Sequence, residues 1–230
     1  IGKGTQRHAL LVGSAGSGKT TATLLVLSQL VSNNRYAYLL PLPIIPNIKA
    51  EGAIDSYLCN VLDIDAATFE VMVQRLDPIF LLDSLDEARG LEDEDVALGI
   101  LPRNPLLRKA RVIVSCRREL VVAAKIKDDR AVLVGSWANS SALDTVAVWN
   151  VSPFSKEDTE SMLQLHAKRD SKTTLDQLKS NISAAPSEFH SHPLLMTMML
   201  QTNPTSLAKV FAKKAATGIV RRKLYNAFLE

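Results

Sequence analysis

Short apolar runs recur through residues 1–151 and are separated by longer stretches with helical spacing. Continuous apolar runs that end at polar or turn-forming residues are typical of buried parallel strands. The runs that indicate strands lie at residues 9–12, 36–42, 79–82, 111–115 and 145–151. Helical patterns lie at residues 21–30, 53–62 and 66–75. This alternation predicts an α/β fold with a parallel sheet of about five strands.

From residue 152 onward, apolar positions recur with helical spacing only. Ser155 and Asp158 resemble a capping box, with Asp158 in place of the usual Glu or Gln, so we expect a helix from there to about residue 168. Pro193 suits the first turn of a later helix. Other helical patterns lie at residues 175–182, 205–216 and 222–229. We therefore predict two domains, an α/β domain over residues 1–151 and a small all-helical domain over residues 152–230.

The composition indicates an ordinary globular protein and excludes several other classes, but it does not indicate a particular chemistry. The chain has 230 residues, of which 47% are hydrophobic and 22% charged, as in ordinary globular proteins. It holds no apolar run long enough for a transmembrane helix, so no membrane partner is expected. The net charge of +3 is too small to indicate nucleic acid. Two cysteines and no visible signal peptide favour a reducing, cytoplasmic location. Because the chain starts at Ile1 and stops at Glu230 within a helical pattern, we expect a fragment of a longer protein.

The first strand leads into a glycine-rich loop that matches the phosphate-binding pattern G-x-x-x-x-G-K-[ST] in full. Its residues are Gly13, Ser14, Ala15, Gly16, Ser17, Gly18, Lys19 and Thr20. Small residues allow backbone N–H groups to converge on phosphate oxygens, and the following helix adds its positive N-terminal end. Lys19 would contact the β- and γ-phosphates, and the Thr20 hydroxyl can ligate Mg²⁺. The alternative is a glycine-rich turn without a ligand.

Acidic residues end the strand at residues 79–82. An acid at the carboxyl end of a parallel strand points into the ligand crevice of an open sheet. Asp83 is therefore placed to hold Mg²⁺, directly or through water. Either Asp86 or Glu87 could polarise the attacking water or complete the metal shell. The alternative is that Asp86 and Glu87 are solvated loop acids leading into the acidic residues 92–95. The intervening strand at 36–42 favours the P-loop class with an inserted central strand.

A cation ends the next strand. Arg117 would face the γ-phosphate if its strand lies beside the acidic one, and it could sense that group or stabilise transition-state charge. The alternative is a surface cation near a helix start, and Arg118 is a weaker candidate for the same role. A second basic group lies near residue 220; it is either a solvated helix face or a site for a phosphate or acidic partner. Its members are Lys209, Lys213, Lys214, Arg221, Arg222 and Lys223.

Together these segments resemble a NACHT domain, within the STAND branch of the P-loop NTPases, which is related to AAA+ proteins. The distinctive feature is a Walker B of Asp, small, hydrophobic, Asp and Glu after a strand. Matching segments cover nearly the whole chain: residues 9–21 for Walker A, 80–87 for Walker B, 112–117 for the sensor strand, 151–158 for the domain junction, 192–195 for the proline segment and 224–228 near the end. Ser84 stands where Gly is common, Ser115 and Cys116 replace Thr-Ser, and residues 118–144 match no family segment.

The resemblance implies a three-layer α/β/α P-loop NTPase fold followed by a helical domain, with ATP or ADP and Mg²⁺ as cofactors. It extends the nucleotide contacts to Thr21 and implies that Pro193 approaches the base. ATP rather than GTP rests on this resemblance alone. It also implies a closed ADP form and an open ATP form that self-associates, in signalling proteins of immune, death or other pathways whose further domains lie outside this segment.

Three functions follow from these residues. The first is a slowly hydrolysing ATPase switch that controls the conformation and oligomerisation of a larger signalling protein. The second is a scaffold that holds nucleotide structurally with negligible turnover. The third, a remodelling AAA+ motor, is less favoured because no second arginine is clearly placed as a trans-acting finger and no pore-loop aromatic pair is found.

Overall fold

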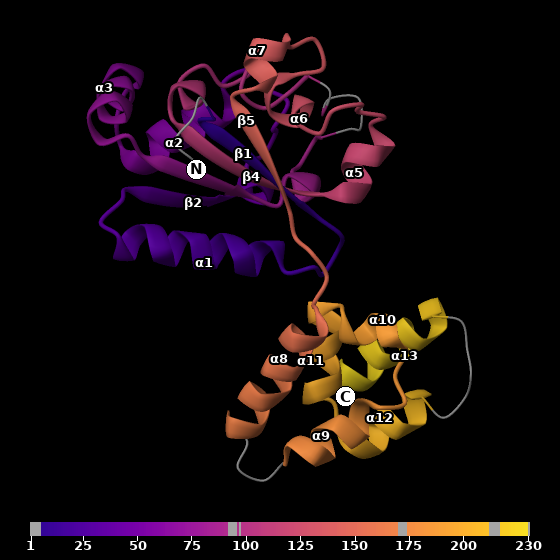
Figure 1. The fold of residues 1–230 in the computed structure, drawn as a ribbon. Coiled ribbons are helices and arrows are strands. Elements are labelled where there is room, and N and C mark those ends of the chain that lie inside the picture. The colour runs from indigo at the N-terminus through magenta and orange to yellow at the C-terminus, as the bar shows by residue number, and fades with distance from the viewer. Residues whose placement is uncertain (1–5, 92–95, 97, 170–173, 212–216, 230) are drawn as a thin grey trace. The chain divides into compact units, whose positions relative to one another are not determined.

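The computed structural model describes residues 6–91, 96, 98–169, 174–211 and 217–229. It divides into two compact units, the first of residues 1–15 and 19–151 and the second of residues 16–18 and 152–230. Figure 1 shows the sheet in the first and helices alone in the second. No helix among the described residues is long and apolar enough to cross a membrane.

The first unit contains a five-stranded sheet in which all neighbouring strands are parallel. Its strands are β1 (His8–Gly13), β2 (Ala37–Pro41), β3 (Ile79–Asp83), β4 (Arg111–Arg117) and β5 (Val146–Asn150). Their spatial order is β2-β3-β4-β1-β5. The predicted parallel sheet and its strand number are therefore confirmed. The observed fifth strand is one residue shorter at each end than the predicted strand at residues 145–151.

The inserted central strand is β4, which pairs with β1 on one side and with β3 on the other. In the register of these pairs Gly13 lies opposite Arg117, and Leu82 lies opposite Val114. The glycine loop, the acidic end of β3 and the cationic end of β4 consequently meet at one edge of the sheet, as the placement of Arg117 beside the acidic strand predicts.

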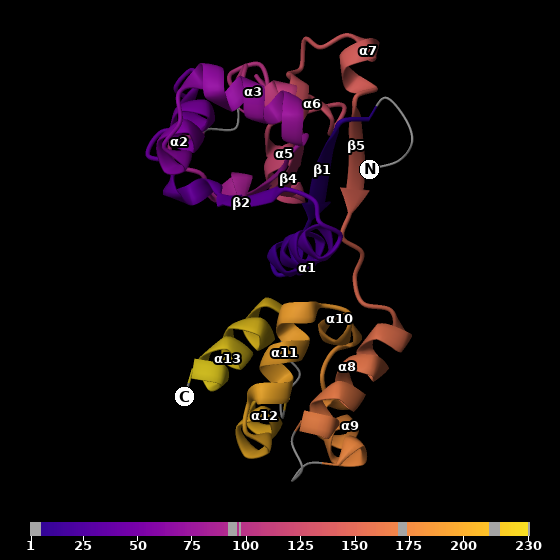
Figure 2. The same ribbon diagram turned by 90° about the vertical axis from the view of Figure 1, so that its left-hand side faces the viewer.

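Alternate residues of the strands face opposite layers of helix, which gives three layers. One face, including Leu10, Phe80 and Val112, packs against α2 (Ala53–Leu62) and α3 (Ala66–Leu76). The other face, including Leu81 and Ile113, packs against the apolar side of α1 (Lys19–Ser32). Figures 1 and 2 show α1 on one side of the sheet and α2 and α3 on the other. The predicted α/β/α layering is confirmed.

Short helices fill the connections of the first unit. The segment 118–144, which matches no family motif, forms α5 (Arg118–Ala123), α6 (Ala131–Val134) and α7 (Ser140–Leu143). Three short 3-10 helices are η1 (Leu42–Ile44), η2 (Leu85–Glu87) and η3 (Leu107–Lys109). Helices of three to six residues span fewer than about two turns, so the apolar pattern could not predict them.

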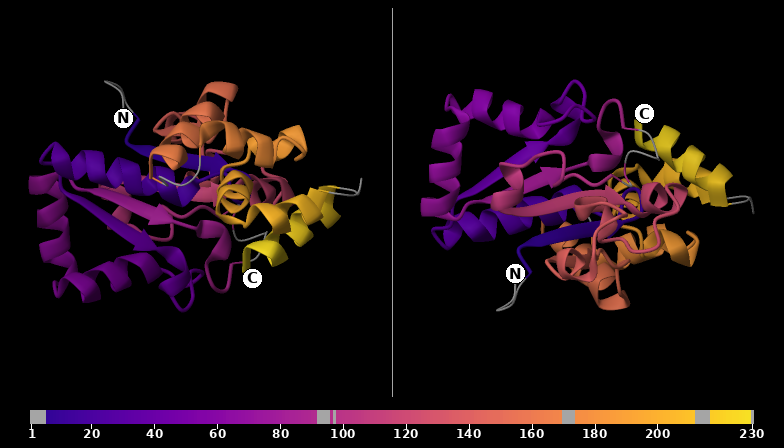
Figure 3. Two further views of the ribbon diagram at one scale, coloured as in Figure 1. Left: turned by 90° about the horizontal axis from the view of Figure 1, so that it is seen from below. Right: turned by 90° about the horizontal axis from the view of Figure 1, so that it is seen from above.

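The second unit is all helical in the described residues, which confirms the predicted change of class. Its helices, orange to yellow in Figure 3, are α8 (Lys156–Arg169), α9 (Leu175–Ile182), α10 (Ser187–His190), α11 (Pro193–Gln201), α12 (Pro204–Phe211) and α13 (Thr217–Leu229). Ser155 and Asp158 form the expected capping box: the backbone N–H of each donates to the side chain of the other, at 2.9 and 3.0 Å. Residues 212–216 of an expected helix lie outside the described part, and α13 begins five residues before the predicted start.

Candidate functional site

The glycine loop runs from the end of β1 to Lys19, the first residue of α1. Gly16 and Gly18 adopt the left-handed backbone, with φ of +71° and +94°, which side-chain-bearing residues rarely adopt. A Cβ built on Gly18 would have no atom within 4 Å, so the space above that peptide is open. The loop therefore leaves room for a ligand to approach backbone N–H groups at the positive end of α1.

The Lys19 side chain folds back over the start of this loop. Its ammonium group donates to the carbonyl oxygens of Gly13 and Ser14, at 3.0 Å each. These contacts fix a full positive charge beside the glycine loop. The charge and the N–H groups together form an environment for an anion with several oxygens.

Asp83, at the end of β3, is held through both of its carboxylate oxygens. The Thr20 hydroxyl donates to Oδ2 at 2.8 Å, and the Ser115 hydroxyl donates to Oδ1 at 2.5 Å. The carboxylate is buried, with only 6% of the residue exposed. The two residues predicted as Mg²⁺ ligands, Thr20 and Asp83, are thus brought together, and oxygen donors are the ligands that Mg²⁺ prefers.

Ser115 is a site residue that the sequence did not identify. Its hydroxyl donates to Asp83 and accepts a hydrogen bond from the Ser84 backbone N–H at 2.8 Å, so it orients the end of β3 from the neighbouring strand. Ser115 and Cys116 stand where the family usually has Thr-Ser, and the Ser115 side chain makes the polar contacts at this end of β4. Ser84 adopts the left-handed backbone, with φ of +61°, which explains why Gly suits this position.

Arg117 joins the two remaining acids. Its Nε lies 2.7 Å from Asp86 Oδ2, its backbone N–H donates to Asp86 Oδ1 at 2.9 Å, and its Nη2 donates to Glu87 Oε1 at 2.7 Å. The Asp86 side chain is 6% exposed and that of Glu87 is 52% exposed. Asp86 is therefore not the solvated loop acid of the alternative interpretation, whereas Glu87 keeps contact with solvent.

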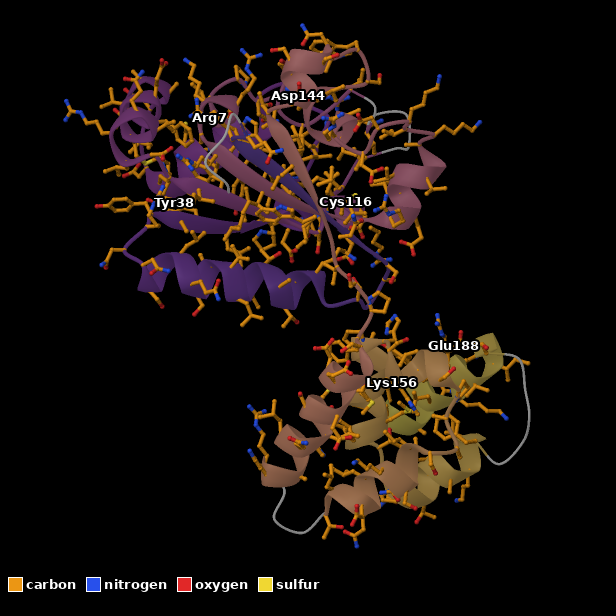
Figure 4. The ribbon with its side chains drawn as sticks, in the orientation of Figure 1. Arg7, Tyr38, Cys116, Asp144, Lys156 and Glu188 are labelled. Carbon is orange, nitrogen blue, oxygen red and sulfur yellow. The ribbon has the colours of Figure 1, made fainter. Side chains whose placement is uncertain are left out.

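The neighbours of Arg117 on the chain make separate contacts. Arg118 hydrogen-bonds to Asp129 and Asn150, whereas Arg117 is the cation that contacts Asp86 and Glu87. Burial, followed by the charge of Asp86, raises the pKa of the Cys116 thiol to about 12, so this thiol remains protonated at neutral pH. Figure 4 labels Cys116 on the sheet.

A family model for the NACHT domain matches residues 7–170. The chain belongs to the NACHT domain family. This match confirms the recognition made from the two Walker segments and the sensor strand. A search of curated proteins finds no match.

Solved structures place the NACHT domain among known folds. Cdc6p from Pyrobaculum aerophilum is 19% identical, with a TM-score of 0.52 over 96% of this chain and 60% of that one. AMPPCP-bound DnaA from Aquifex aeolicus is 11% identical (TM-score 0.49, 95% and 59% covered), and a STAND protein with a tetratricopeptide repeat sensor from Pyrococcus horikoshii is 16% identical (TM-score 0.47, 96% and 30% covered). The likeness to Cdc6p supports the P-loop NTPase fold. The chain spans between 30% and 60% of the length of these proteins.

The residues of this NACHT domain fit a nucleotide with Mg²⁺. The loop offers open backbone at Gly18, a lysine charge and a hydroxyl–carboxylate pair of oxygen donors. The Ser17 hydroxyl is buried and has no hydrogen-bond partner in the part of the chain that the structure describes, as expected of a group that awaits a polar ligand. Thr21 follows in the first turn of α1.

The remaining candidates lie in the second unit. Pro193 occupies the first turn of α11, as the sequence predicts, and its approach to a nucleotide base stays a prediction. In the basic group, the Arg221 guanidinium lies 5.9 Å from the centre of the Phe189 ring, while Lys213 and Lys214 lie outside the described residues. The stacking of Arg221 on a core aromatic ring favours a structural role for that cation.

Proposed function

We propose that the chain is an ATP- and ADP-binding switch module that hydrolyses ATP slowly and controls the conformation and oligomerisation of a larger signalling protein. Family membership supports nucleotide binding. The observation that carries the proposal is the convergence of the Thr20–Asp83 pair and the Arg117–Asp86–Glu87 cluster at the carboxyl edge of adjacent strands.

In this proposal the loop residues 13–21 hold the phosphates, and Lys19 neutralises part of their charge. Thr20 and Asp83 would hold Mg²⁺, which when bound withdraws charge from the phosphate oxygens. Ser115 fixes the orientation of the Asp83 carboxylate through the bond at Oδ1, so that Oδ2 faces Thr20. These hydrogen bonds support the proposal that the residues that would hold Mg²⁺ are oriented before a ligand binds.

The two acids beside Arg117 take different roles. Asp86 accepts a hydrogen bond from the Arg117 backbone N–H at Oδ1 and is ion-paired with the Arg117 guanidinium through Oδ2, so Asp86 positions that side chain. Glu87 is bonded through Oε1 and is half exposed, so it is the better candidate for polarising the attacking water. A γ-phosphate would compete with Glu87 for the Arg117 guanidinium, and this exchange would leave Glu87 available to the water while Arg117 stabilises phosphate charge.

The switch requires that ATP and ADP favour different arrangements of the two units, because a ligand shifts an equilibrium only through a difference in affinity. A connection within the first unit supports such a link. Arg118 follows Arg117 directly and hydrogen-bonds to Asn150, the last residue of β5, just before the chain leaves this unit. Movement of Arg117 toward a phosphate would therefore shift Arg118 and its hydrogen bond to Asn150, close to the start of the second unit. Self-association in the ATP state, action together with other domains and a cytoplasmic location belong to the same proposal.

The second candidate is a scaffold that holds ATP or ADP with negligible turnover. One observation favours it: the Glu87 carboxylate, which would polarise the water, is ion-paired with Arg117 at 2.7 Å. If nucleotide binding does not break this pair, the acid remains neutralised and the chemistry does not proceed.

Nucleotide content and single-turnover hydrolysis of the purified chain distinguish the two candidates. We expect bound ADP or ATP in the wild type, loss of that nucleotide in Lys19→Ala, and retained binding with lost hydrolysis in Glu87→Gln. Glu157→Gln, a change of an exposed acid in α8, is the matched control and should behave as the wild type. Bound nucleotide without turnover above that of Glu87→Gln would favour the scaffold. Unchanged affinity in Lys19→Ala would contradict the site itself.

A further inference from the structure

A cavity of about 370 Å³ lies in the first unit at the amino ends of β1 and β5. Its lining includes Arg7, His8, Leu101, Arg108, Trp137 and Thr145. Because β1 runs from His8 to Gly13, this cavity lies at the edge of the sheet opposite to the glycine loop. Figure 4 shows Arg7, with Asp144 of the segment before β5, toward this end of the first unit. The proposed ATPase function uses none of these residues.

The His8 imidazole is the first indication of a ligand. The residue is only 5% exposed, and its Nδ1 is buried with no hydrogen-bond partner among the described residues. Burial, reinforced by the positive charge of Arg7, lowers the pKa of His8 to about 4, so the ring is neutral. Buried polar atoms normally have a partner, and one left without a partner lowers stability. A polar group entering the cavity would supply that partner.

Cations at the rim indicate the charge of the ligand. Arg7 uses one guanidinium hydrogen bond on the Lys109 carbonyl oxygen, at 2.8 Å, which holds its position beside the cavity. The Arg108 side chain is exposed and makes no hydrogen bond or ion pair with the residues that the structure describes. None of the described residues that line the cavity is acidic. Two arginines without a carboxylate between them favour a carboxylate or phosphate group.

An aromatic wall indicates the rest of the ligand. The Trp137 side chain is 67% exposed, although a ring of this size normally buries most of its surface. The buried side chains of Leu101 and Val134 also line the cavity. A flat ring packed against Trp137 at this wall would cover the apolar surface of the indole that now faces water.

We propose that this cavity binds a small aromatic carboxylate. The carboxylate would pair with Arg7 and Arg108, the ring would pack on Trp137 and Leu101, and the neutral imidazole of His8 would hydrogen-bond to a polar atom of the ligand. Inorganic phosphate has no ring to pack on Trp137, and an aromatic amide has no charge to pair with Arg7 and Arg108. Neither would therefore contact both the aromatic wall and the arginines of the cavity.

Trp137 itself reports on binding. The chain has two tryptophans, so in a Trp149→Phe background the fluorescence of Trp137 is observed alone. Phenylacetate is the probe, phenylacetamide is its uncharged match, and inorganic phosphate tests for a simple anion site. We expect a saturable change in Trp137 emission with phenylacetate, with affinity at least about tenfold higher than for phenylacetamide or phosphate.

Variants of exposed residues keep the test independent of folding. Arg108→Gln should weaken phenylacetate binding by about tenfold or more, because one charged partner is lost. Arg75→Gln, a change of an exposed arginine at the end of α3, and Lys19→Ala, in the glycine loop, should leave it unchanged. Equal binding of phenylacetate and phenylacetamide, equal binding of phosphate, or unchanged affinity in Arg108→Gln would each overturn the proposal. So would the absence of any saturable response.

Discussion

The two edges of the sheet both bury polar side chains, but they treat them differently. At the carboxyl edge, Asp83 is hydrogen-bonded at both oxygens and Asp86 is paired with Arg117. At the amino edge, the buried Nδ1 of His8 has no partner in the described part of the chain. Paired buried groups hold a fixed geometry, whereas an unpaired one lowers stability until something binds it. The comparison distinguishes a site that is organised in advance from one that we expect a ligand to complete.

Removing the central acid of the carboxyl edge should have the largest effect. The proposed function makes Asp83 a direct Mg²⁺ ligand, and a direct ligand contributes more than the outer residues whose loss costs about 10- to 100-fold. In Asp83→Ala, the Mg²⁺-dependent part of nucleotide affinity should therefore fall by about 1,000-fold, or about 4 kcal/mol. Calorimetric titration with ATP, with and without Mg²⁺, measures this. Asp176→Asn, on α9, is the control, and an equal loss in that variant would remove the assignment.

Acid should reveal the unpaired histidine of the amino edge. Because burial lowers the pKa of His8 from 6.5 to about 4, the unfolded chain binds a proton in that range and the folded chain does not. The free energy of unfolding is therefore unaffected by His8 titration above pH 6.5. It decreases as the pH falls from 6.5 toward 4, by about 3 kcal/mol in total.

Urea unfolding across this pH range checks the sign. His8→Gln should lose most of this pH dependence, while His166→Gln, a change of a half-buried histidine in α8, should keep it. Equal slopes in the wild type and His8→Gln would show that His8 is not held neutral by burial.

A smaller effect is expected from the residue that orients Asp83. Ser115→Ala removes the hydrogen bond to Oδ1 and leaves the Ser84 N–H without its partner, so Mg²⁺-nucleotide affinity should fall by about tenfold. Ser115→Thr keeps the hydroxyl and should restore most of it. If alanine and threonine give the same affinity in calorimetric titration, the hydroxyl does not position the carboxylate.

The smallest effect concerns the backbone after β3. Ser84 has φ of +61°, and glycine removes the strain of a side chain there, so Ser84→Gly should raise the free energy of unfolding by up to about 1 kcal/mol. Asn34→Gly, at another left-handed position (φ of +55°), should gain less because Asn tolerates this conformation. Chemical denaturation compares the two, and a destabilised Ser84→Gly would contradict the account.

Much of the fold follows from sequence because its signals are local. Apolar runs predicted each of the five strands among the described residues. The capping box at Ser155 is present, and the predicted helix at residues 53–62 coincides with α2. The glycine loop and the acidic end of β3 could also be predicted from local sequence patterns.

What sequence could not predict depends on the pairing of distant strands. The contact of Ser115 with Asp83 arises because β4 lies beside β3, and a serine after an apolar run gives no sign of it. The proposed choice of Glu87 rather than Asp86 as the acid that polarises water depends on their exposure and on their contacts with Arg117, which the sequence does not show. The His8 cavity joins residues from five separate segments, which no local pattern reveals.

Single-turnover hydrolysis of ATP with Mg²⁺ tests the central claim most directly, comparing the wild type with Glu87→Gln at equal nucleotide occupancy. The account predicts slow conversion of bound ATP to ADP in the wild type and a rate lower by about 10²- to 10⁴-fold in the variant, as expected for loss of a general base. Indistinguishable rates in the two proteins, or no conversion in either, would contradict a hydrolysing switch.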